Sequence, residues 1–182
     1  MKIAIAVALT LIVTMFVRWG IPVLACDENG FFSLDDVKRK VPQFEENRVS
    51  VQPIKKPVPV VLKGNPEARL YRSVLREGAA KGPNFAGRYT IVQWGCGAGC
   101  VDWAIVDAIT GKAFFIDNAR DVSVARVTPL PLVFRLGSNL LVLLGAPKED
   151  ETRNGITYYL WNGKSLRQLD HIPASDLCRA GR

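Results

Sequence analysis

The chain has 182 residues, of which 48% are hydrophobic, and this favours one globular domain whose core needs no metal to form. Its four cysteines are too few for a small disulfide-dense scaffold, although an even number suits two bridges. The net charge of +7 falls to +5 without residues 1–25, because 22 basic and 17 acidic residues remain. So modest an excess does not predict a nucleic acid partner.

Residues 1–25 have the pattern of a secretory signal peptide. Lys2 precedes an unbroken apolar run, Ile3–Val17, which is shorter than a typical membrane span. Val23-Leu24-Ala25 then offers a cleavage site, so that the mature single domain comprises residues 26–182. The alternative is a lipid anchor on Cys26, although the apolar run does not abut this cysteine. Both interpretations predict a periplasmic or secreted, oxidising location, and without the lipid anchor no membrane contact after cleavage.

Two helix starts are visible in the N-terminal half. Ser33 can cap a short helix that ends before Pro42, and Asn65 followed by Pro66 predicts a helix to about Ala80. On a helical wheel, the second helix would bury Ala68, Leu70, Tyr71, Val74 and Leu75 and expose Arg69, Arg72 and Arg76. Between the helices, prolines predict an extended segment with room for a short edge strand at Val58–Leu62.

From Arg88 onward the pattern indicates β structure. Arg88–Gly95 has apolar side chains on both sides, which predicts a central strand covered on both faces. Three hairpins follow, formed by Trp103–Asp107 with Lys112–Ile116, Leu132–Leu136 with Leu140–Leu144, and Ile156–Trp161 with Ser165–Leu169 around Asn162-Gly163. We therefore predict an α+β fold, mainly an antiparallel β meander in one sheet, with one or two helices in the N-terminal half. A barrel-like or propeller-like arrangement is the alternative.

The cysteines are expected to pair as Cys96–Cys100 and Cys26–Cys178. Gly97 and Gly99 allow a reversing loop, which can bring the first pair within the roughly 4.4–6.8 Å between α-carbons that a disulfide needs. In the chain-entropy model so small a loop contributes only about 2 kcal/mol, and its main effect is to fix the loop's shape. The second bridge would close most of the mature chain.

Three other uses of the cysteines remain open. With His171, the only histidine, Cys96 and Cys100 could bind copper or zinc, although no βαβ pattern accompanies them. They could form a redox-active dithiol, although the usual motif has two intervening residues. Either cysteine could also be a nucleophile with His171 as its base. The sequence has no serine hydrolase elbow, phosphate loop, zinc-protease helix or dinucleotide fingerprint.

The candidate ligand-binding residues lie on either side of this loop. Trp94 and Trp103 bracket it, and strand pairing would place their indoles near one another, beside Arg88 and Asp102. A rigid loop with aromatic walls and one or two charges suits a small binding site. The alternative is that both tryptophans belong to the core.

The run FAGRYTIVQWGCGAGC, from Phe85 to Cys100, resembles a group of small secreted bacterial proteins of unknown activity. The resemblance extends loosely over Gly64–Arg69 and over Ile105–Lys112. It implies a bacterial envelope or secreted location and no particular activity. We therefore expect a non-enzymatic binding domain without a cofactor, whose Cys96–Cys100 loop contacts a protein or another envelope component. The alternatives are an envelope thiol-redox or copper/zinc protein and an envelope hydrolase.

Overall fold

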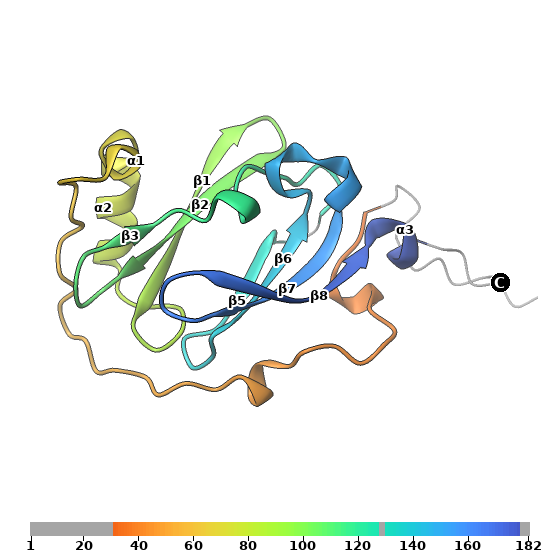
Figure 1. Cartoon of the computed structure of the whole chain (residues 1–182), viewed down its shortest axis with the longest axis horizontal. Coiled ribbons are helices and arrows are strands. Elements are labelled where there is room, and N and C mark those ends of the chain that lie inside the picture. Colours follow the sequence, from red (N-terminus) through yellow and green to blue (C-terminus); the bar gives the residue numbers. More distant parts are fainter. Residues whose placement is uncertain (1–30, 128–129, 179–182) are drawn as a thin grey trace, which may run out of the picture.

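The computed structural model describes residues 31–127 and 130–178 (Figure 1), so the predicted signal peptide and Cys26 lie outside the described residues. Its strands are antiparallel and form two sheets. The first has the order β1-β2-β3, with β4 also paired to β2, and the second has the order β5-β6-β7-β8. The predicted α+β meander is confirmed, although the strands divide between two sheets instead of forming one.

The elements have the following bounds. The helices are α1 (Pro66–Leu70), α2 (Arg72–Ala80) and α3 (Ala174–Leu177), with short 3-10 turns at Leu34–Asp36, Phe44–Glu46, Asp117–Ala119, Pro147–Glu149 and Glu151–Arg153. The strands are β1 (Tyr89–Gly97), β2 (Cys100–Asp107), β3 (Ala113–Phe114), β4 (Val122–Ser123), β5 (Leu132–Phe134), β6 (Leu140–Gly145), β7 (Gly155–Trp161) and β8 (Leu166–Pro173).

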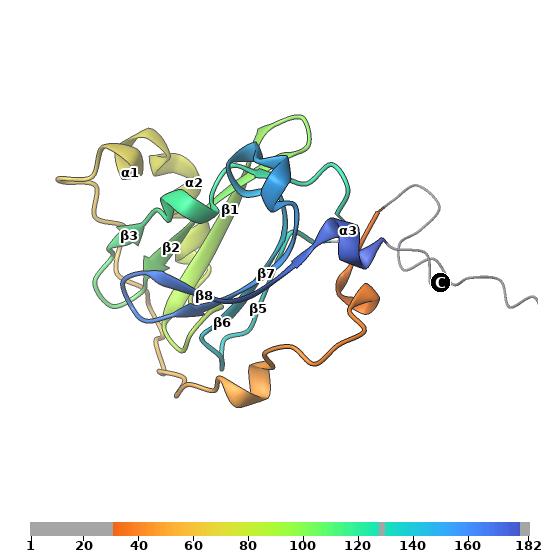
Figure 2. The ribbon, with the colours of Figure 1, turned by 45° about the vertical axis from the view of Figure 1, so that its right-hand side comes forward.

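Three apolar clusters define the layers, which Figure 2 shows from the side. The central cluster joins inward side chains of both sheets, among them Ile91, Trp103, Leu141 and Tyr159. A second cluster packs α1 and α2 on the outer face of the first sheet, and a third packs the segment 32–44 and α3 on the outer face of the second sheet. Both sheets are therefore covered on both faces.

The helix predicted from Asn65 is interrupted once. The Asn65 side chain caps it, accepting a hydrogen bond from the backbone of Ala68 at 2.9 Å, as the sequence indicated. Tyr71 then leaves the helical conformation (φ −94°, ψ 20°) and separates α1 from α2. Leu70, the last residue of α1, is 70% exposed, so its predicted burial is wrong.

Two other N-terminal predictions need correction. Ser33 does form a capping box with Asp36, but the helix is a single 3-10 turn that ends at Asp36 instead of continuing towards Pro42. Val58–Leu62 is not a strand, although the backbone of Val58 donates to Ala108 O and that of Val61 to Gly111 O, both at 2.8 Å. The prolines around this segment limit the regular pairing that a strand requires.

Strand β4 links the two sheets. It pairs with β2 through Cys100 and Val101, and Ser123 also forms an isolated bridge with Ala146 beyond β6. Gly145 permits this approach, because it has φ +121° and a β-carbon there would collide with the backbone oxygen of Ser123. The tip end of the β1–β2 hairpin, at Cys100 and Val101, is thus attached through β4 to the second sheet.

Candidate functional site

The β1–β2 hairpin projects at the top of both ribbon views (Figures 1 and 2). Its turn is Ala98-Gly99, between the paired residues Gly97 and Cys100, and Gly99 has the positive φ (+68°) that favours glycine. The predicted Cys96–Cys100 disulfide is present, with 5.2 Å between the α-carbons. Residues 95–99 are all exposed and carry no side chain larger than that of Cys96. The tip therefore offers a partner mainly backbone groups held in one shape.

Strand β1 lies at the edge of its sheet, although its apolar residues on both sides predicted a central strand. The Asn84 side chain blocks the first part of this edge, because it accepts from Ile91 N at 2.8 Å and donates to Ile91 O at 3.1 Å. Backbone groups alternate in direction along an antiparallel strand, so those of Gln93 and Gly95 point the same way as those of Ile91, away from β2. Within the described residues neither has a hydrogen-bond partner there, and both residues are exposed.

The edge of the second sheet at β8 is better protected. Along β8, Arg39 makes a two-pronged ion pair with Asp170, at 2.7 and 2.8 Å, and Arg167 adds a further charged side chain on the same strand. Charges and covering segments are the usual ways in which proteins prevent edge pairing. The exposed end of β1, residues 93–97, has no charged residue and no proline, and only a bulge at Cys96 interrupts it.

The structure separates the four residues predicted to line a small site. Trp94 is paired with Asp102, and Gln93 with Trp103, so the two indoles lie on opposite faces of the hairpin. Trp94 packs on Tyr71 at the helix layer, with ring centroids 4.7 Å apart, whereas Trp103 is fully buried between the sheets. Arg88 precedes the other end of β1 and pairs with Asp107 at 3.0 Å. The predicted cluster does not form.

Asp102 is engaged in a buried ion pair that the sequence did not predict. Arg120 donates from Nε and Nη2 to the two carboxylate oxygens, at 3.0 and 2.6 Å, and its Nη1 contacts Glu67. The hydrogen bonds that Arg120 donates to Asp102 are the main reason that the pKa of Arg120 lies above its usual value. The arginine also lies 4.9 Å above the Phe115 ring. This cluster fastens α1 to β2, and it leaves Asp102 no free oxygen for a ligand.

His171 is not placed to act as a metal ligand with Cys96 and Cys100, nor as a catalytic base for either cysteine. It lies on β8, in the second sheet, and its Nδ1 shares a hydrogen bond of 2.8 Å with the hydroxyl of the buried Thr157. Cys96 and Cys100 are joined to each other in the first sheet. Across residues 31–127 and 130–178, no group of three His, Cys, Asp or Glu side chains is placed to hold a metal ion.

The environment of His171 predicts a pH dependence. Burial lowers its pKa and the charge of Arg153 lowers it further, while Asp170 opposes them. Because the fold disfavours the protonated ring, the free energy of unfolding should fall as the pH drops below about 6.5, the ordinary histidine pKa. Arg39 lowers the pKa of Asp170, so this ion pair also stabilises the fold. Its contribution to the free energy of unfolding is lost only below about pH 3.9, the ordinary aspartate pKa. Urea denaturation between about pH 7.5 and 5 measures the first effect.

His171→Gln is the control for this prediction, since the chain has no other histidine. The variant should lose most of the decline between about pH 7 and 5 while remaining folded at neutral pH. A wild-type protein whose stability is flat over this range, or a variant with the same decline, would contradict the assignment.

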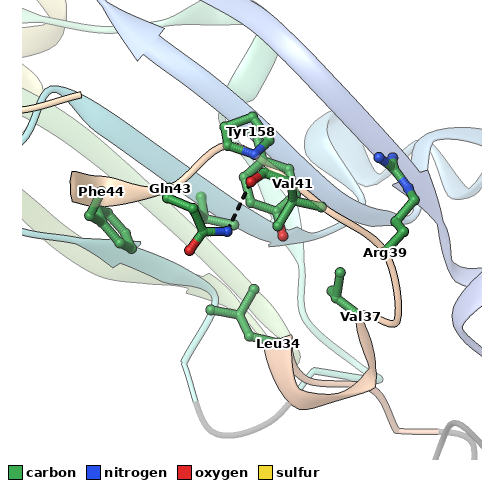
Figure 3. Close-up of a pocket in the computed structure, with 9 residues that line it drawn as sticks. Leu34, Val37, Arg39, Val41, Gln43, Phe44 and Tyr158 are labelled. Carbon is green, nitrogen blue, oxygen red and sulfur yellow. Dashed lines mark hydrogen bonds between the residues drawn. The ribbon is translucent and has the colours of Figure 1, made fainter. Parts of the chain in front are cut away.

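Figure 3 shows a pocket of about 280 Å³ between the segment 34–44 and the outer face of the second sheet. Its walls are largely aliphatic and aromatic. Gln43 bonds internally to Val41 O at 2.8 Å, and Arg39 is held by Asp170. The Gln43 amide and the Arg39 guanidinium are therefore already engaged, and the pocket mainly marks where this segment covers the sheet.

Cys178 is in a disulfide, and its predicted partner, Cys26, lies outside the described residues. The described helices include none that is long and apolar enough to cross a bilayer. Comparison with protein-family models, curated proteins and solved structures gives no match. The candidate site is therefore defined by geometry alone: the free edge of β1 at Gln93 and Gly95, next to the disulfide-closed tip. Sequence analysis identified the tip but not the edge.

Proposed function

We propose that the mature chain is a periplasmic or secreted binding domain, which captures an extended segment of a partner protein by strand addition at the exposed end of β1. The observation that carries this proposal is the set of free backbone groups at Gln93 and Gly95 on an uncharged edge. They lie two residues apart, about 6.8 Å along an extended strand, the repeat at which another strand pairs. Peptides commonly bind proteins by adding a strand to such an edge.

The disulfide supports this function through preorganisation. It ties Cys96 to Cys100 beside the free edge, so that less conformational entropy is lost when a peptide binds there. Because the tip residues are glycine, alanine and cysteine, no long side chain obstructs an approaching backbone. A disulfide in this position also favours an oxidising compartment.

The alternative functions have less support. A redox or metal site needs accessible thiolates with a further ligand, but the two sulfurs are bonded to each other and Cys100 is buried. A hydrolase needs a nucleophile in reach of a base, but the hydroxyl beside His171 belongs to Thr157, which is only 3% exposed.

The experiment begins with a display library of unstructured peptides selected on the purified mature chain. Binding of the selected peptides should weaken at least about tenfold in Gln93→Pro, because proline removes the free N–H without removing a bond to β2. Gln93→Ala is the matched control, because it keeps that N–H and should bind normally. Amide exchange at Gln93 and Gly95 should slow when peptide is added.

Three outcomes would overturn the proposal. The library could yield no binder, or the binders could be equally tight in Gln93→Pro and wild type. The mature chain could also form a dimer that Gln93→Pro dissociates, and the occupant of the edge would then be a second copy of this chain. Urea denaturation of both variants establishes that a loss of binding is not a loss of fold.

A further inference from the structure

A second pocket, of about 340 Å³, is an apolar groove between α2 and the proline-rich segment that precedes α1. We call it the Pro57 groove. Figure 1 shows the segment as the orange-to-yellow stretch of chain that leads up to α1. Residues 57–60 form one wall, and Ala79 and Ala80 of α2 form the other. Lys56 and Arg76 complete the lining, and the proposed function of the hairpin uses none of these residues.

Both walls of the groove are held in place by contacts outside it. The backbone of Val58 donates to Ala108 O at 2.8 Å, which fastens the segment to the turn between β2 and β3. Val60 and Ala79 come from opposite walls and belong to the same buried apolar cluster. The groove is therefore formed in advance of any ligand, as small-molecule sites usually are.

The walls offer apolar surface but almost no backbone donors. Val58 is 40% exposed, and Ala80 is exposed opposite it. Pro57 and Pro59 have no N–H group, and that of Val58 is already bonded to Ala108 O. The N–H groups of the other wall are used inside α2. An extended peptide would leave carbonyl groups unsatisfied here, whereas an aliphatic chain has none to satisfy.

The charges on the groove are all positive. Lys56 stands on one wall and Arg76 on the other, and both are exposed. Neither side chain has an ion pair within residues 31–127 and 130–178. None of the described residues that line the groove is acidic. A ligand that is apolar along its length and anionic at one end matches this arrangement.

The groove continues into a further hollow of about 440 Å³, which shares Pro57 and Ala80 with it. This hollow lies at the C-terminal end of α2, and Lys55 and Lys81 add two more cations to its lining. The available space is thus drawn out along the segment 52–60, which suits a chain better than a compact ring system.

We propose that the Pro57 groove binds a fatty acid. The aliphatic chain lies between residues 57–60 and α2, and the carboxylate is held by the charges of Lys56 and Arg76. The groove shares no residue with the β1 edge at Gln93 and Gly95, so either proposal can fail without the other.

The test follows the methyl signals of the ¹³C-labelled mature chain. Sodium octanoate, decanoate and dodecanoate are titrated below their micelle concentrations at constant ionic strength, with acetate and decanol for comparison. We expect the Val58, Val60 and Ala79 signals to shift saturably, and the affinity to rise about two- to fourfold for each added methylene. Acetate should leave these signals in place. Decanol, which lacks the charge, should bind about fivefold more weakly than decanoate.

Two variants with matched controls locate the site. Val58→Asn should weaken decanoate binding at least about fivefold, whereas Val61→Asn should not, because Val61 is similarly exposed (46%) but lies outside the groove lining. Arg76→Gln should weaken binding about threefold, whereas Arg69→Gln should bind as wild type does, because Arg69 is exposed on α1 outside the lining. Urea denaturation checks that each variant is folded.

Several results would overturn the proposal. Decanoate could leave the methyl signals unchanged, bind no more tightly than octanoate, or bind no more tightly than decanol. Val58→Asn and Val61→Asn could also behave alike. If the mature chain instead sedimented with phosphatidylglycerol vesicles and Val58→Asn abolished this, the occupant would be a bilayer surface and not a free fatty acid.

Discussion

Replacing Arg120 with methionine is expected to destabilise the fold by about 3–5 kcal/mol, because it would leave Asp102 as a buried carboxylate without a cation. Asp102 is 0% exposed, and Arg120 is 6% exposed. The guanidinium donates to both carboxylate oxygens, and the backbone of Trp103 adds a third hydrogen bond at 2.7 Å. Water cannot replace the lost partner at such a site, so the full cost of desolvating the charge would remain. Equilibrium urea denaturation measures the loss.

Two controls separate this ion pair from its surroundings. Glu67 also contacts Arg120, but its side chain is 46% exposed, so Glu67→Gln should cost less than about 1 kcal/mol. The double variant Asp102→Leu with Arg120→Met removes both charges and should recover much of the stability lost in the single variant. The explanation would be wrong if the double variant were as unstable as Arg120→Met, or if Arg120→Met were nearly as stable as wild type. Either result would show that an unpaired buried charge on Asp102 is not the cause of the loss.

Short-range chemistry explains what the sequence predicted correctly. The cap at Asn65, the Asn162-Gly163 turn and the Cys96–Cys100 loop each depend on residues within a few positions of one another. The predicted hairpin is present, although Trp161 pairs with Leu166, so that its loop has the four residues 162–165. The backbone of Asn162 donates to Ser165 O at 3.2 Å, and Gly163 has the positive φ (+93°) that favours glycine. Local signals of this kind do not depend on how the sheets are arranged.

Most of the misplaced residues depend on contacts between distant segments. The helix break at Tyr71, next to Leu70, is local, but the partner of Asp102 is Arg120, which follows a 3-10 turn and does not lie on a neighbouring strand. The apolar pattern of β1 correctly indicated cover on both faces, but it carries no information about pairing at the edge. Edge position, which defines the proposed binding site, is a property of the topology.

The position of the two hairpin tryptophans was the largest error in the predicted site, and it leads to a second large effect. Trp103→Ala is expected to cost about 3–5 kcal/mol, because the indole is fully buried between the sheets. Trp103→Phe should still cost about 1–3 kcal/mol, because the oxygen of the buried Ala119 would lose its donor. A ligand-binding role for Trp103 predicts the opposite, namely lost binding with little change in stability.

Trp94→Phe is the matched comparison on the other face of the same hairpin. Its Nε1 is buried without an acceptor, so phenylalanine removes an unsatisfied donor and keeps a ring next to Tyr71 and Phe115. We expect its free energy of unfolding to stay within about 1 kcal/mol of wild type or to rise. Circular dichroism in urea follows each variant without relying on the fluorescence of the replaced residue. If Trp94→Phe proved costlier than Trp103→Phe, the roles assigned to the two faces would be reversed.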